Sequence, residues 1–267
     1  MIREPAVAGQ FYSGDPRTLR RVIDSFLQKP ASLLDAKAVV SPHAGYIYSG
    51  GVAGAVFSSV RLPTRFIILG PNHTGVGTRL ALAPAGEWRT PLGSVAIDNE
   101  LNRQLLKHCP RLREDRTAHL REHSLEVQLP FLQVLAPHFR FAAICVGTAD
   151  YEVLEELGKA IARVIQDSLE TILVLASSDM NHFEPATVAS QKDRLAIEKI
   201  QVLDPRGLHT VVCERDISMC GFAPTISALT ASRELGATQG KLIRYANSGD
   251  VSGDYDSVVG YAGLAIV

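Results

Sequence analysis

The sequence predicts an α/β fold: one three-layer domain around a central, mostly parallel sheet that is mixed at its edges. Short apolar segments rich in β-branched residues alternate with longer segments of helical periodicity. Several of the short segments, such as FIIL and TILVLA, are continuously apolar, which is typical of strands covered on both faces. The chain contains no linker, repeat or low-complexity stretch, so we expect its 267 residues to form a single domain, 1–267.

The strand predictions follow the apolar segments in chain order. They are Ala38–Ser41, Arg65–Leu69, Leu80–Pro84, Ser94–Ile97, Phe141–Val146, Thr171–Ala176, Lys241–Ala246 and Ser257–Ile266. Leu80–Pro84 and Ser94–Ile97 are joined through GEWRTPLG, and we expect them to pair with each other as an antiparallel excursion from the parallel centre.

The helix predictions fill the intervals between these strands. They are Ser49–Val60, Asp98–His108, Ser124–Leu135, Tyr151–Leu169, Thr187–Leu203, Pro205–Cys213 and Phe222–Leu235. Asp98 suits an N-cap because its carboxylate can accept from the free amides of the first turn. Pro130 should kink its helix or lie in the first turn, since proline has no amide hydrogen. Tyr151–Leu169 carries a clear apolar stripe.

Composition excludes several functional classes. With 27 Lys plus Arg against 28 Asp plus Glu, the net charge is −1, so no basic field favours nucleic acid or an anionic membrane as a partner. No apolar run approaches the about 18 residues of a membrane span. The N-terminus lacks a secretory pattern and the four cysteines form no CxxC pair, so we expect a cytoplasmic protein with reduced thiols. The motifs GxSxG, HExxH, GxxxxGK[ST] and GxGxxG are absent from the sequence.

Polar loops follow four predicted strands. His43 lies in SPHAGYIYSGG after the first strand, His73 in PNHTGVG, and Asp179 and His182 in SSDMNHFEP, while NSGD follows Lys241–Ala246. In open α/β sheets, ligands bind beyond the carboxyl ends of the strands. A single histidine after a strand is usually a turn residue. Three on one rim favour a cluster for metal binding or proton transfer.

Two histidines need a third ligand to hold a metal. The candidates are Asp179, His182, Glu126 and Cys220. Cys220 lies in SMCGFAPT before a predicted helix, and a helix N-terminus would lower the pKa of its thiol and favour a thiolate ligand. The alternative is that Cys220 is a small buried apolar residue.

The segment REHSLEVQLPF is a second dense group of polar residues. Glu122, His123 and Glu126 open the predicted helix Ser124–Leu135. Its acids can complement the helix dipole, or His123 can cover the site from above. Both interpretations stay open at this stage.

Five motifs occur in a recognisable order: PHAGYIYSG, ILGPNHTG, EHSLEVQLPF, SSDMNHF and MCGFAP. In this order they resemble the Memo family, whose bacterial and archaeal members are called AmmeMemoRadiSam system protein B. The opening REPAVAGQFYSGDP and the closing YDSVVGYAGLAI fit the same pattern, so the resemblance covers essentially the whole chain.

The resemblance implies a fold related to class III extradiol dioxygenases, which are non-haem iron enzymes. Carried over motif by motif, it implies that His43, His73 and Cys220 are metal ligands. His182 takes the acid/base position, and Asp179 and His123 line the same pocket. We expect Asp179 to orient His182, three residues further along the chain.

The function implied is a metal-dependent redox enzyme, dioxygenase-like, that acts on an unidentified small molecule. A divalent metal is expected, with iron first and copper or zinc as alternatives, because a thiolate is a softer ligand than a carboxylate. Two other readings stay open: a peptide- or protein-binding adaptor with a vestigial metal site, and a zinc hydrolase.

Overall fold

The computed structural model describes residues 2–267, so Met1 of the predicted domain lies outside the described residues. Within this part of the chain, twelve strands form one sheet. They are β1 (Ile2–Arg3), β2 (Ala38–Ser41), β3 (Arg65–Pro71), β4 (Leu80–Leu82), β5 (Glu87–Thr90), β6 (Gly93–Ile97), β7 (Arg113–Glu114), β8 (Arg140–Val146), β9 (Ile172–Ser177), β10 (His182–Glu184), β11 (Gly240–Asn247) and β12 (Val258–Ile266).

The centre of the sheet is parallel and its edges are antiparallel. The main order is β1-β5-β6-β8-β3-β9-β2-β12-β10, with β11 beside β12 and with β4 between β7 and β8. Strands β6, β8, β3, β9 and β2 run parallel to one another, whereas β12 is antiparallel to β2, β10 and β11. This arrangement confirms the predicted mixed, mostly parallel α/β sheet.

Nine α-helices and two short 3₁₀-helices are present in residues 2–267. They are α1 (Pro16–Phe26), α2 (Tyr46–Ser59), α3 (Asn99–His108), η1 (Thr117–His119), η2 (Glu126–Gln128), α4 (Leu129–Leu135), α5 (Tyr151–Gln166), α6 (Ala186–Gln201), α7 (Pro205–Glu214), α8 (Phe222–Glu234) and α9 (Gly249–Ser252). Asp98 caps α3 as predicted, accepting from the amides of Glu100 and Leu101. Pro130 lies in the first turn of α4.

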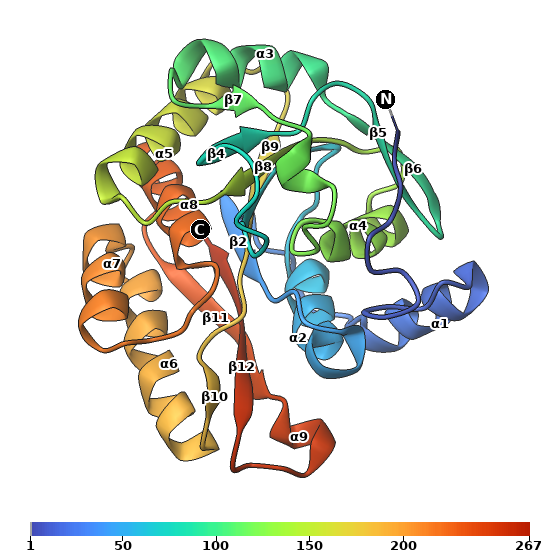
Figure 1. Ribbon diagram of the computed structural model, residues 1–267, viewed down its shortest axis with the longest axis vertical. Helices are drawn as coiled ribbons and strands as arrows, with labels where there is room; N and C mark the ends of the chain where they lie inside the picture. The colour runs from blue at the N-terminus through green and yellow to red at the C-terminus, as the bar shows by residue number, and fades with distance from the viewer. Residues whose placement is uncertain (1) are drawn as a thin grey trace.

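The side chains of each buried strand point alternately to the two faces of the sheet, and helices that cover both faces produce the three layers. In β3, Ile67 and Leu69 face the core on the side of α3, α5, α6, α7 and α8, whereas Phe66 and Ile68 face the core on the side of α1, α2 and α4. Successive side chains of a strand point to opposite faces, so a strand apolar at every position must be covered on both. Figure 1 shows the two helical groups on either side of the sheet.

One strand-pairing prediction is wrong. β4 pairs with β8 and β7, and the antiparallel partner of β6 is β5, which lies within the linking sequence GEWRTPLG. β5 is too short and polar to stand out as an apolar run. The helix α1 was not predicted, although Asp15 caps it and Pro16 occupies its first turn.

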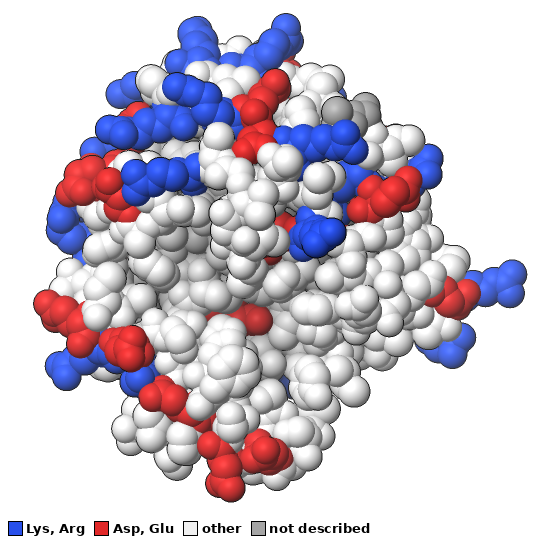
Figure 2. All heavy atoms as spheres, in the orientation of Figure 1, with Lys and Arg blue, Asp and Glu red and all other residues white. Residues whose placement is uncertain are grey.

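Charged side chains of both signs share the face drawn in Figure 2. Lysine and arginine gather at the end that carries α3, and aspartate and glutamate lie among them and at the opposite end. Among residues 2–267, no helix is long and apolar enough to cross a membrane.

Candidate metal centre

His43 and His73 meet at the carboxyl edge of the parallel strands. His43 follows β2, which ends at Ser41, and His73 follows β3, which ends at Pro71. Their ring centroids lie 5.1 Å apart. β2 and β3 lie on either side of β9 and run parallel to it, so the loops after them lie at the same edge of the sheet. The predicted placement of these two histidines on one rim is confirmed.

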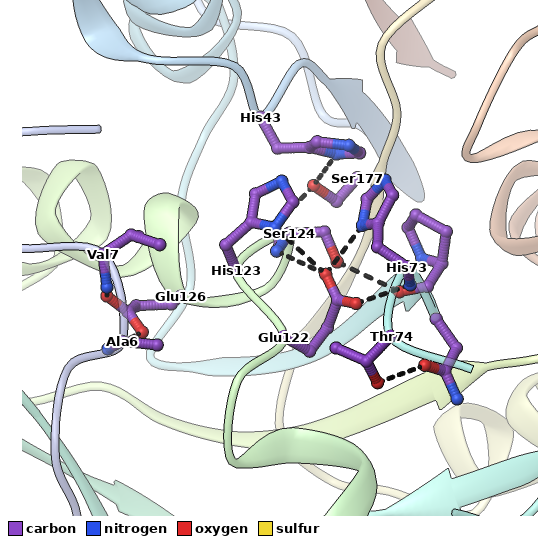
Figure 3. A network of polar contacts seen from close by, with 12 residues as sticks. Ala6, Val7, His43, His73, Thr74, Glu122, His123, Ser124, Glu126 and Ser177 are labelled. Atoms are coloured by element: carbon purple, nitrogen blue, oxygen red, sulfur yellow. Dashed lines mark hydrogen bonds and ion pairs between the residues drawn. The ribbon is translucent and has the colours of Figure 1, made fainter. Parts of the chain in front are cut away.

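His123 completes a group of three imidazoles. One ring nitrogen from each of His43, His73 and His123 lies within 4.8 Å of the others. His43 is buried, His123 is half-buried and His73 is open to solvent. Figure 3 shows the three rings facing a common space. Neutral imidazole is a common metal ligand, so this group could hold a divalent metal ion.

Two of the three imidazoles are fixed by hydrogen bonds at Nδ1. His73 Nδ1 lies 2.9 Å from Glu122 Oε1, and the His73 amide donates to the other carboxylate oxygen, Oε2, at 2.7 Å (Figure 3). His43 Nδ1 lies 2.9 Å from Ser177 Oγ. Burial alone would raise the pKa of Glu122, but its hydrogen bond and charge interaction with His73 outweigh this and lower it to about 2. Glu122 is therefore an ionised carboxylate that accepts hydrogen bonds from the amide and the ring N–H of His73.

His123 is held differently. Its Nδ1 is 3.6 Å from the same Glu122 oxygen, too long for a good hydrogen bond. Its ring stacks on His73 with centroids 4.6 Å apart and packs against Phe11 at 4.7 Å. Burial lowers the pKa of His123, so the side chain is a neutral, packed imidazole.

Cys220 reaches the same space from the loop before α8. Its Sγ lies 3.2 Å from His43 Nε2. The expectation of a lowered thiol pKa is wrong: burial raises the pKa of Cys220 well above its ordinary value, and the nearby Asp179 carboxyl adds to the effect. Without a cation beside it, Cys220 is therefore a thiol.

Asp179 makes a hydrogen bond with the backbone of His43, and His182 has a different hydrogen-bond partner. Its Oδ1 accepts from the His43 amide at 2.8 Å, and its Oδ2 lies 4.0 Å from His43 Nε2. Among residues 2–267, no hydrogen bond or ion pair joins Asp179 to His182, whose ring and amide face Ser218, so the expectation that Asp179 orients His182 finds no contact to support it. Burial raises the pKa of Asp179 to about 7, against the lowering effect of the His43 amide.

His182 opens β10 beside an irregularity in the sheet. Its Nδ1 lies 2.9 Å from the Ser218 carbonyl oxygen, and its amide donates to Ser218 Oγ at 2.7 Å. The register of β10 against β12 shifts between His182 and Glu184, and Phe183 between them has φ 61° and is 76% exposed. A β-bulge re-aims the side chains beside it, a device frequent next to functional sites. Burial lowers the pKa of His182.

Glu126 is excluded as a metal ligand by its contacts. Both oxygens are fully buried and accept hydrogen bonds from the N-terminal segment: the Arg3 guanidinium, the amides of Ala6 and Val7, and the Tyr12 hydroxyl. Its role is to fasten that segment, which carries Phe11 to His123. The predicted helix Ser124–Leu135 begins late, with η2 followed by α4.

Sequence reasoning did not find the hydrogen-bond partners of His43 and His182. Ser177 at the end of β9, Gln128 in η2 and Ser218 before Cys220 lie within the quoted motifs, but serine and glutamine are common polar residues that do not by themselves indicate a site. A usable signal existed for Ser177, since it is a serine that ends an otherwise apolar strand at the same edge as His43.

Comparison with known proteins places the chain among its relatives. The family model described as Memo-like protein matches residues 3–265. A MEMO1 family protein of Methanopyrus kandleri is 45% identical, with 99% of this chain and 98% of the relative covered. A MEMO1 family protein of Aquifex aeolicus is 41% identical, with 98% of each chain covered.

A solved structure shares the fold at much lower sequence identity. The crystal structure of an uncharacterized protein from Escherichia coli K12 superposes with a TM-score of 0.60 at 12% identity, covering 85% of this chain and 98% of that one. This likeness concerns the fold alone. The full-length family match and the identities above 40% show that the chain belongs to the Memo-like protein family.

Proposed function

We propose that the protein is a metal-dependent redox enzyme that acts on a small molecule, with His43, His73 and Cys220 as the metal ligands. The observation that carries the proposal is the pair His43 Nε2 and Cys220 Sγ, 3.2 Å apart. Nitrogen and sulfur ligands at about 2.1 and 2.3 Å from one ion lie roughly 3–3.6 Å from each other. These two donor atoms therefore fit a shared metal, and a ring nitrogen of His73 lies within 4.8 Å of one of His43.

The hydrogen bonds behind each imidazole favour Cys220 over His123 as the third ligand. A ligating histidine almost always donates its other ring N–H to an acceptor. His43 and His73 have such partners, whereas the nearest acceptor of His123 lies 3.6 Å away. His123 is then a wall of the pocket, available to a substrate.

The donor set indicates which chemistry the ion would supply. Two imidazoles and a thiolate suit iron, copper or zinc, and iron or copper would supply electron transfer. Three protein ligands leave open positions, as is typical of catalytic metals. His182 donates from Nδ1 to a carbonyl, so its Nε2 carries a lone pair and can take a proton from a substrate.

Elemental analysis with electron paramagnetic resonance on anaerobically purified protein tests the proposal. We expect about one iron or copper per chain, with a resonance signal in one oxidation state that changes on oxidation. Stoichiometric zinc without a redox-active metal would contradict the redox assignment and favour a hydrolase. Protein that takes up none of these metals at micromolar concentration would favour an adaptor.

A further inference from the structure

We propose that Ser177 and Gln128 are positioning residues that hold His43 in the tautomer with the proton on Nδ1, so that the Nε2 lone pair faces Cys220 and the metal position. Which ring nitrogen carries the proton decides whether a histidine can be a ligand at Nε2. The hydrogen-bond chain behind His43 determines this, because Gln128 and Ser177 each also donate to a backbone carbonyl oxygen, which can only accept.

The first carbonyl, that of Pro42, determines the orientation of the Gln128 side-chain amide. Its side-chain nitrogen lies 2.9 Å from the Pro42 carbonyl oxygen and 2.8 Å from Ser177 Oγ. The amide oxygen cannot take that position, because it would face the Pro42 oxygen with no hydrogen between them. Gln128 therefore donates both amide hydrogens, one to Pro42 and one to Ser177.

The second carbonyl, that of Ser124, determines where the Ser177 hydroxyl hydrogen points. Its hydroxyl donates to the Ser124 carbonyl oxygen at 2.6 Å, and a hydroxyl has one hydrogen. Ser177 Oγ can then only accept from Gln128 and from His43. The ring nitrogen that faces it, His43 Nδ1, must carry a proton. The neutral imidazole is left with its lone pair on Nε2, on the side of Cys220.

Because these side chains are buried, water cannot replace any hydrogen bond of this arrangement. Ser177 and Ser124 have no exposed surface, and Gln128 and His43 are each 1% exposed. Reversing any donor would leave a buried polar atom unpaired, at a cost of about 1–3 kcal/mol.

One short segment thereby orients both proposed histidine ligands. Residues 122–128 contain Glu122, which accepts from His73 Nδ1, as well as Ser124 and Gln128, which act on His43 through Ser177. The segment bridges the loops after β2 and β3 and the end of β9, which are the three strand ends around the centre. Figure 3 shows Glu122 and Ser124 of this segment below the ring of His43. The inference rests on the proposed metal site for its purpose, although the tautomer can be measured without any metal.

The experiment is nitrogen NMR of metal-free protein labelled with ¹⁵N in histidine, with His43→Gln to assign the signals. We expect His43 to show the pattern of a protonated Nδ1. Ser177→Ala should raise the Nε2-protonated population, and Ser177→Cys, a nearly isosteric change to a weaker acceptor, should do so to a smaller extent. Zn²⁺ affinity, measured by competition with a chromophoric chelator, should fall about 10–100-fold in Ser177→Ala.

Ser41→Ala is the matched control. Ser41 pairs with Ser177 across β2 and β9, is equally buried, and its hydroxyl has no partner among residues 2–267. The control should keep both the tautomer and the Zn²⁺ affinity of the wild type. A wild-type His43 protonated on Nε2, or a Ser177→Ala variant equal to Ser41→Ala in both measurements, would overturn the inference. Wild-type protein with the expected tautomer but no metal binding would instead overturn the proposed function.

Discussion

Glu126→Gln is expected to destabilise the protein strongly without removing the metal centre. Glu126 Oε2 accepts from Arg3 at 2.6 Å and from the Ala6 amide at 2.7 Å, while Oε1 accepts from the Val7 amide at 3.1 Å and the Tyr12 hydroxyl at 2.6 Å. A glutamine NH₂ would face two donors at the Oε2 position, or the Val7 amide at the Oε1 position, where the Tyr12 hydroxyl can turn to accept from it. The change therefore removes at least one hydrogen bond and leaves the buried Arg3 charge without its carboxylate.

The expected loss is about 3–5 kcal/mol, the usual cost of breaking a buried ion pair from one side. At this chain length that corresponds to a fall of roughly 5–9 °C in Tm. Urea and thermal unfolding followed by circular dichroism measure both quantities. Glu4→Gln is the control, because the Glu4–Arg89 pair is exposed and should contribute less than about 1 kcal/mol. A Glu126→Gln variant as stable as Glu4→Gln would refute the reasoning.

Three further predictions concern pH, packing and proton transfer. Burial lowers the pKa of His119 to about 4 from an ordinary 6.5, so the folded protein resists a proton that the unfolded chain accepts; stability should be full above pH 6.5 and fall by about 3 kcal/mol toward pH 4, and urea titrations of His119→Gln should show a flatter profile. In α2, a Cβ at Gly54 would lie 2.5 Å from the backbone oxygen of Phe26, whereas at Gly51 the nearest atom is 3.6 Å away. In urea unfolding, Gly54→Ala should lower the free energy of unfolding by about 1–3 kcal/mol, and Gly51→Ala should raise it by up to about 1 kcal/mol. Equal effects of the two substitutions would show that the contact at Gly54 yields without strain. His182→Ala should keep the full metal content and lower metal-dependent turnover by roughly 10²–10⁴-fold, whereas loss of the metal would make His182 a ligand.

The sequence predicted the central strands and the edge on which the site lies, because both depend on local pattern. Short, continuous apolar runs such as that of β3 are typical of strands covered on both faces, and the loops after β2 and β3 carry His43 and His73. The short strand β5 and helix α1 were missed, since the first is polar and brief and the second has few buried residues.

Contacts between distant segments could not be predicted from local pattern. The orientation of Asp179 toward His43 depends on the turn after β9, and the fate of Glu126 depends on the N-terminal segment more than a hundred residues earlier. The pKa of Cys220 likewise follows from burial beneath packed loops, which no helix-end argument contains. Both carboxyls and the thiol were recognised as candidates, but their partners are set by the tertiary fold.

The most direct test of the proposed centre is metal stoichiometry in four proteins: wild type, His43→Ala, Cys220→Ala and His123→Ala. Each is purified anaerobically, loaded with the same metal, desalted and measured by elemental analysis, with circular dichroism to establish folding. We predict about one metal per chain in wild type and in His123→Ala, and a marked loss in His43→Ala and Cys220→Ala. Equal loading of Cys220→Ala and wild type, with loss in His123→Ala, would contradict the proposed ligand set and assign the third position to His123.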